Sequence, residues 1–109
     1  MLPAPTADCP VASLSIEDTS RLLIDNLDSA AEAGPHIWWD GKAWMIRGVR
    51  ITSEQVLDTF AVWGAASASR HPSLAHAIDA QDWQRVIILL HLYPDTAVSI
   101  LGFLVALHR

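Results

Sequence analysis

The sequence predicts an α+β fold that is mainly helical: an N-terminal helix, one β-hairpin, and then three to four helices with the C-terminal helix at the centre. Three observations lead to this prediction. Residues 16–33 place apolar and charged side chains with a helical period, and Asp40-Gly41 separates two runs rich in tryptophan and isoleucine. Two almost entirely apolar runs, 86–92 and 97–107, flank Tyr93-Pro94-Asp95. Helical periodicity indicates a helix with one buried face, Asp-Gly between such runs indicates a hairpin, and proline favours a corner between two helices.

The composition predicts one domain with a sizeable core, because a chain of 109 residues buries about two-thirds of its unfolded surface. Residues 1–12 contain three prolines and little to bury, so we expect a flexible arm there and a single globular domain over 13–109. An apolar fraction of 51% with only 17% charged residues excludes a solvated disordered chain. The net charge of −5 argues against direct nucleic-acid binding, which needs a basic face.

The same features predict a cytoplasmic protein. Cys9 is the only cysteine, so no intramolecular disulfide can form, and the N-terminus lacks the basic segment and apolar run of a secretion signal. The run 86–107 is long enough to cross a bilayer, but Pro94-Asp95 interrupts it, which argues against a membrane span.

The first helix is predicted from a cap at Ser13 or Ser15 to about Ala33, with Gly34 and Pro35 ending it. Its apolar stripe faces a charged stripe on the opposite side, and the charged residues are Glu17, Arg21, Asp25, Asp28 and Glu32.

The hairpin is predicted to turn at Asp40-Gly41 as a two-residue type I′ loop, which places Trp39 opposite Lys42 and Ile37 opposite Trp44. One face of the ribbon then carries Ile37, Trp39, Lys42, Trp44 and Ile46, and the other carries His36, Trp38, Ala43 and Met45. Gly48 is predicted to be either a bulge or a bend into a third segment, 49–51.

A second helix is predicted after a cap at Thr52 or Ser53, and a short helical turn is predicted from Pro72 or Ser73 to Ile78. We expect the next helix over 80–92, with Asp79 and Asp82 as a capping pair.

The last helix is predicted from Thr96 to Leu107, with Asp95 as its N-cap and Gly102 as a point of close approach. A helix that is apolar on nearly all sides needs about five or six neighbours, and the chain supplies about four. This shortfall predicts a homodimer or another protein partner.

No residue pattern predicts catalysis, a cofactor or a metal. The five histidines lack the spacing of ligands on one helix or in a zinc finger, and no nucleophile motif or phosphate-binding loop is present. His91 lies in an apolar helix, so we expect it to be buried or half-buried and bonded to a carbonyl or to a neighbour such as Tyr93.

The acidic end of the first helix is the first candidate partner-binding site. Asp25, Asp28 and Glu32 lie toward the C-terminal end of the helix, where its dipole disfavours negative charge, and Asp28 and Glu32 have no cation at helical spacing. Three interpretations remain open: a solvated face, a docking surface for a basic partner, and internal pairing with cations of the hairpin (Lys42, Arg47 and Arg50).

The hairpin tryptophans are the second candidate site. Trp38 and Trp39 are adjacent, so they point to opposite faces of the ribbon, and Trp44 shares the face of Trp39. Helices packed on both faces of the ribbon would bury all three tryptophans. If one face of the ribbon is uncovered, its tryptophan would offer a surface to a partner or to a second copy of the chain. Lys42 is expected to cover Trp39 by cation–π contact.

These features together predict a small non-enzymatic interaction module: an adaptor, a chaperone-like factor, or an inhibitor of a larger partner. The alternative is a protein that binds an apolar ligand or lipid in a pocket between the hairpin and the C-terminal helices.

Overall fold

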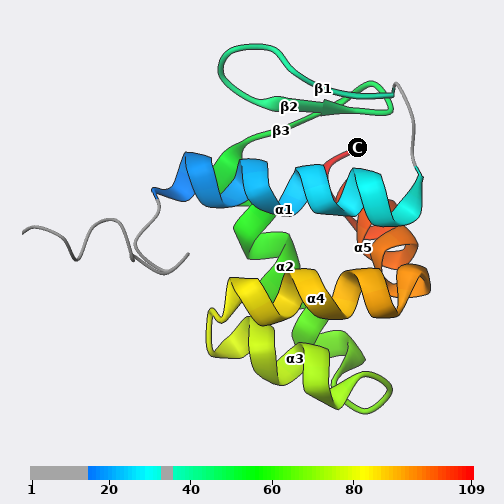
Figure 1. Cartoon of the computed structure of the whole chain (residues 1–109). Helices are drawn as coiled ribbons and strands as arrows, with labels where there is room; N and C mark the ends of the chain where they lie inside the picture. Colours follow the sequence, from blue (N-terminus) through cyan, green and yellow to red (C-terminus); the bar gives the residue numbers. More distant parts are fainter. Residues whose placement is uncertain (1–14, 33–35) are drawn as a thin grey trace, which may run out of the picture.

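The computed structural model describes residues 15–32 and 36–109, which form five helices and a three-stranded antiparallel sheet (Figure 1). Their bounds are α1 Ile16–Ala31, β1 Ile37–Trp39, β2 Trp44–Ile46, β3 Val49–Ile51, α2 Ser53–Ser67, α3 Pro72–Asp79, α4 Trp83–Leu92 and α5 Pro94–His108. The predicted order of helix, hairpin and helices is confirmed, and β3 extends the hairpin into a meander. The predicted flexible arm over 1–12 and the helix stop at Gly34 and Pro35 lie outside the described residues.

The helices form a layered body with the sheet on one side of α1 and α4 on the other (Figure 1). The last helix, α5, contacts α1, α2, α4 and β3, which is the central position that the sequence predicts. A continuous core joins all these elements, and the large side chains at its centre are fully buried: Leu23, Leu27, Ile46, Phe60, Val86, Leu90, Ile100 and Leu104.

The predicted register of the first hairpin is wrong by two residues. Trp39 pairs with Trp44 and Ile37 with Ile46, so the connection has four residues, Asp40 to Ala43. The cause is the Asp40 side chain, whose Oδ1 accepts the backbone N–H groups of Lys42 and Ala43 at 2.8 Å each. These hydrogen bonds, and then the Arg50 guanidinium, lower the pKa of Asp40. A shift of two residues preserves the faces, so Ile37, Trp39, Trp44 and Ile46 still share one side.

The two-residue turn occurs instead in the second hairpin. Ile46 pairs with Val49, and the two residues between them, Arg47 and Gly48, have φ values of 51° and 81°. Positive φ at both central positions is what a type I′ turn requires. Of the two alternatives for Gly48, the bend into a third segment is therefore the correct one.

Three helix ends differ from the prediction. Helix α1 ends at Ala31, because Glu32 takes a left-handed conformation with φ 52° and donates its N–H to Asp28. Helix α4 begins at Trp83 and not at Ala80, since Asp82 accepts the N–H of Arg85 as the N-cap. Helix α5 begins at Pro94, with Tyr93 in place of Asp95 at the N-cap, because proline fits the first turn without losing a hydrogen bond.

Gly48 and Gly102 are expected to respond to alanine with opposite signs. Gly48→Ala forces a side chain into a backbone with φ +81°, and we expect it to lower the free energy of unfolding by about 1–2 kcal/mol. Gly102→Ala in the middle of α5 meets no described atom within 4 Å and is expected to raise it by about 1 kcal/mol. Urea unfolding followed by circular dichroism measures both, and a destabilised Gly102→Ala would show that this helix face is covered. The predicted close approach at Gly102 is accordingly not found among the described residues.

One side of α5 remains open in the described part of the chain. Val98 and Leu107 are about half exposed, and Gly102 lies on the exposed side as well. Within the described residues, no single helix has both the length and the apolar character to cross a bilayer; α4 and α5 meet that test only together, and they are bent by 111°.

Candidate functional site

The acidic end of α1 is accessible. Asp25 and Glu32 are exposed and Asp28 is half-buried; we call these three residues the acidic row. The ion pairs found among the described residues join Arg21 to Glu17 at 3.8 Å and Arg50 to Asp40 at 3.6 Å. Within the described residues, the acidic row is therefore not paired with the hairpin cations, and Asp25 and Glu32 are exposed to solvent.

The hairpin tryptophans have three different environments. Trp44 is only 5% exposed, so its prediction as a partner-binding residue is wrong: the ring fills the space between the sheet and α1. Trp39 is half-buried and packs edge-on against Trp44, with 5.1 Å between ring centroids. The cation over Trp39 is Arg21 of α1, 5.9 Å from the ring centroid, and not the predicted Lys42.

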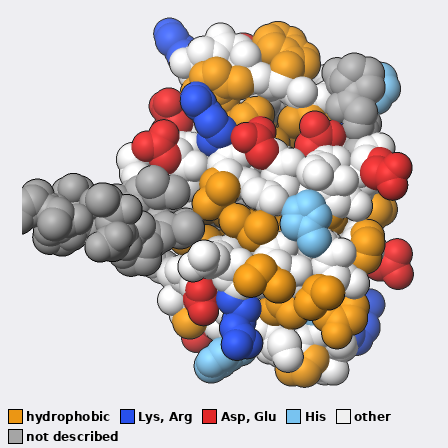
Figure 2. Space-filling view, viewed as in Figure 1, with side chains coloured by type: hydrophobic (Ala, Val, Ile, Leu, Met, Phe, Trp, Pro, Cys, Tyr) orange, Lys and Arg blue, Asp and Glu red, His pale blue; other side chains and the backbone are white. Residues whose placement is uncertain are grey.

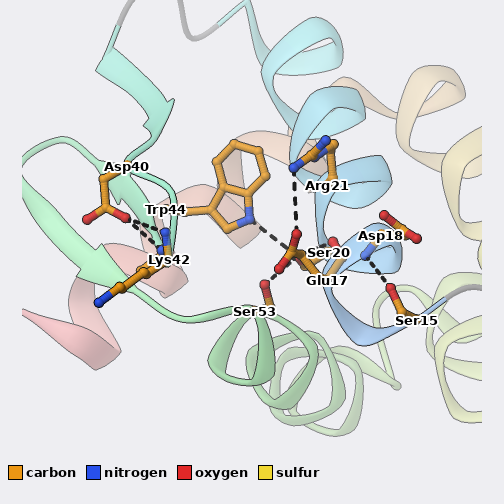
Figure 3. A network of polar contacts seen from close by, with 10 residues as sticks. Ser15, Glu17, Asp18, Ser20, Arg21, Asp40, Lys42, Trp44 and Ser53 are labelled. Carbon is orange, nitrogen blue, oxygen red and sulfur yellow. Dashed lines mark hydrogen bonds and ion pairs between the residues drawn. The ribbon is translucent and has the colours of Figure 1, made fainter.

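Trp44 is held by a polar junction between the sheet and two helices (Figure 3). Its indole Nε1–H donates to Ser20 Oγ at 3.3 Å, and Ser53 Oγ of α2 lies 2.9 Å from the same oxygen. The Ser20 hydroxyl donates to the carbonyl of Glu17 at 2.8 Å. This junction fixes the inner face of the sheet on α1.

Trp38 lies on the outer face of the sheet and is 55% exposed. Its cross-strand partner is Met45, which in turn pairs with the exposed Arg50 on β3. Of the three hairpin tryptophans, Trp38 is therefore the one with most of its surface free.

The structure also shows an apolar surface that sequence reasoning missed. Ile88, Leu92 and Tyr93 are 55%, 63% and 58% exposed, and with the half-buried Leu89 they form what we call the α4 patch. Helix α4 is apolar on almost every side, so its periodicity could not tell the buried face from the free one. The exposed His91 was the single polar signal on this part of the helix.

His91 connects the α4 patch to the acidic helix. Its ring Nε2–H donates to Oδ1, the side-chain carbonyl oxygen of Asn26 on α1, at 2.8 Å. The predicted burial of His91 is wrong, because the residue is exposed, and its partner is a carbonyl and not Tyr93. Figure 2 shows acidic side chains along α1 and hydrophobic side chains over α4 on the same face, with a histidine between the two helices. The acidic row and the α4 patch are thus parts of one surface.

Two shallow grooves border the α4 patch, one on each side of Leu89. The first, about 420 Å³, runs along α4 past Arg85, Ile88 and Leu92. The second, about 320 Å³, lies between the start of α3 and Tyr93. Grooves beside an exposed apolar ridge provide recesses for the side chains of a partner.

Two further histidines, His71 and His108, make contacts within the fold. His71 stacks on Trp63, with 5.7 Å between ring centroids, and His108 Nε2 lies 2.8 Å from Thr59 Oγ1. Since Thr59 already donates its hydroxyl to the Gln55 carbonyl, His108 is the donor in that bond. No cluster of three or more potential metal ligands occurs within the described ranges.

Comparison with known proteins finds no matching family model, no matching curated protein and no matching solved structure.

Proposed function

We propose that this protein is a small non-enzymatic interaction module, acting as an adaptor, chaperone-like factor or inhibitor, that binds a basic amphipathic segment of a partner protein. The observation that carries the proposal is the position of the acidic row beside the α4 patch on one face. Absence of an intramolecular disulfide, with Cys9 as the single cysteine, supports a cytoplasmic setting for this activity.

The two halves of the surface select the same kind of partner. Exposed Ile88 and Leu92 lie one turn apart on α4, so an apolar stripe of a partner helix would cover them and remove both from water. Full burial of an exposed side chain of this size contributes about 1.5–3 kcal/mol. Ile88 and Leu92 are 55% and 63% exposed, so covering them contributes roughly half of that each before the cost of association.

The acidic row adds charge selectivity. Its carboxylates lie toward the C-terminal end of α1, whose last turn has no basic residue. Negative charge near a helix C-terminus is unfavourable by about 0.3–1 kcal/mol, and lysine or arginine of a partner would relieve it. A basic partner is therefore favoured over an acidic or neutral one of equal apolar content.

Among the described residues, no specific contact favours the alternative, a pocket for an apolar ligand between the hairpin and the C-terminal helices. Trp39 and Trp44 pack on each other and on α1, and β3 contacts α5 directly. These contacts bring the hairpin onto α1 and β3 onto α5, and they give the alternative no support.

Affinity capture with matched variants tests the proposed function. We expect Leu92→Lys and the triple change Asp25→Lys, Asp28→Lys and Glu32→Lys each to reduce recovery of the same captured protein by at least about tenfold, the loss typical of hot-spot residues. Quantitative mass spectrometry of proteins captured from native lysate measures the recovery.

Val62→Lys is the control, because Val62 is a half-exposed apolar side chain on α2, outside both parts of the proposed surface. The triple variant is not expected to unfold, since lysine near the C-terminus of α1 suits the helix dipole. Thermal melts verify this. Capture that is equally strong for wild type and both surface variants would contradict the proposal.

A further inference from the structure

The outer strand of the sheet carries a second surface, independent of the α1 and α4 face. The strand order β1-β2-β3 leaves β1 at one edge, and Figure 1 shows β1 as the strand of the sheet farthest from the helices. Within the described residues, β1 has a strand on only one side. An edge of this kind presents unpaired backbone groups that a further strand can bind.

The hydrogen bonds of the first hairpin determine which backbone groups point outward. Arg47 donates its N–H to the His36 carbonyl at 2.9 Å, and Asp40 donates to the Ala43 carbonyl at 3.0 Å. Hydrogen-bonded pairs alternate along an antiparallel ladder, so Trp38 is the residue between them that bonds to β2. Ile37 and Trp39 therefore direct their N–H and C=O groups toward the open edge.

We infer that two copies of this chain pair through β1 in antiparallel register, which joins their sheets into one of six strands. The two-fold axis passes between Trp38 and the partner's Trp38. In this register Ile37 of each copy exchanges two N–H···O bonds with the partner's Trp39, which satisfies all the outward groups of both residues.

The side chains at this edge are self-complementary. Trp38 and the partner's Trp38 form a non-hydrogen-bonded pair, in which Cα atoms are about 4.5 Å apart and side chains are closest. Each indole is 55% exposed in the single chain and is covered by the other in the pair. Aromatic pairs directly opposite each other are among the more stabilising cross-strand contacts.

The polar side chains on this face support the same register. His36 and Asp40 lie two residues before and two after Trp38, on its face of the strand, and Asp40 reaches Arg50 on that face. With Trp38 on the axis, His36 of each copy lies opposite the partner's Asp40. The edge thus meets a second copy of itself with an imidazole opposite a carboxylate at both ends and an aromatic pair in the middle, which is why a second copy is the occupant that fits it best.

Sedimentation velocity over a wide range of protein concentration tests the pairing with the full chain. Wild type is expected to show a reversible monomer–dimer equilibrium. Trp38→Lys places like charges on the two-fold axis and is expected to raise the dissociation constant at least about thirtyfold. Val62→Lys adds the same charge elsewhere and serves as the control, with little change expected.

His36 gives a test that does not alter the tryptophan. His36→Lys faces the partner's Asp40 with opposite charge, and His36→Glu faces it with like charge. At low ionic strength the dissociation constant of His36→Glu is expected to exceed that of His36→Lys by at least about fivefold, because the symmetry makes each substitution act twice. The pair Val62→Lys and Val62→Glu controls for net charge.

Cross-linking verifies the register itself. In a Cys9→Ser background, Trp38→Cys brings two thiols to a Cα separation of about 4.5 Å across the axis, within disulfide range. Met45→Cys, one strand further in on each copy, lies about 14 Å from its counterpart and is the control. Mild oxidation is expected to give a covalent dimer of Trp38→Cys only. A monomeric wild type, a dimer unaffected by Trp38→Lys, or equal cross-linking of the two cysteine variants would overturn the inference.

Discussion

Phe60→Ala is expected to lower the free energy of unfolding by about 3–5 kcal/mol, the usual loss for a buried aromatic side chain. Phe60 is fully buried in α2 and lies edge-on to Trp83 of α4, with ring centroids 6.2 Å apart and planes at 84°. Its removal leaves a cavity where α2 meets α4 and also removes the aromatic contact. Because a domain of this size has a total stability of about 5–15 kcal/mol, the loss should be evident in urea unfolding followed by circular dichroism.

Val62→Ala is the matched control for Phe60→Ala. It removes apolar atoms from the same helix, two residues away, at a site that is about half exposed. Its cost is expected to stay within about 0.5 kcal/mol, as for ordinary surface substitutions. Equal costs for the two variants would show that Phe60 is not the centre of the core.

Ser20→Ala is expected to lower the free energy of unfolding by about 1–3 kcal/mol, because it leaves the buried indole N–H of Trp44 without its acceptor. Trp44→Phe removes the donor instead. In the double variant neither group remains, so its cost should be smaller than the sum of the single costs by about 1 kcal/mol or more. Urea unfolding of the wild type and the three variants gives this double-mutant cycle.

Ser53→Ala provides the comparison for this cycle. Ser53 Oγ lies 2.9 Å from Ser20 Oγ but makes no bond to the indole, so the substitution leaves the Trp44 contact in place. Its cost should be smaller than that of Ser20→Ala and should add to that of Trp44→Phe without coupling. Additive costs for Ser20→Ala and Trp44→Phe would mean that the junction does not hold the sheet on α1.

The two surfaces differ in how far the sequence could predict them. The charged stripe of the first helix has a clear period, so the acidic row could be located from residue spacing alone. The α4 patch could not, because Val86 to Leu92 is apolar on nearly every side and the free side is decided by where α1 and α3 lie. For Trp38 the sequence left two outcomes open, burial under a helix or exposure on the surface. The position of α1 against the other face of the sheet decides between them.

The features that the sequence by itself predicts correctly depend on residues that are close together in the chain. Ser15 caps α1, Thr52 forms a capping box with Gln55, and the alternation of the hairpin places Trp39 and Trp44 on one face. Each of these features involves residues a few positions apart, so their geometry follows from short-range hydrogen bonds and backbone preference.

Long-range packing decided the rest. Arg21 over Trp39, His91 on Asn26 and Ser20 beneath Trp44 join residues on different elements, 18, 65 and 24 positions apart. The hairpin register also depended on one side chain, since the Asp40 carboxylate closes a four-residue loop where the backbone alone favoured two. Such contacts form only when the core brings distant segments together, and in the described part of the chain they leave Trp38, much of the acidic row and the α4 patch exposed.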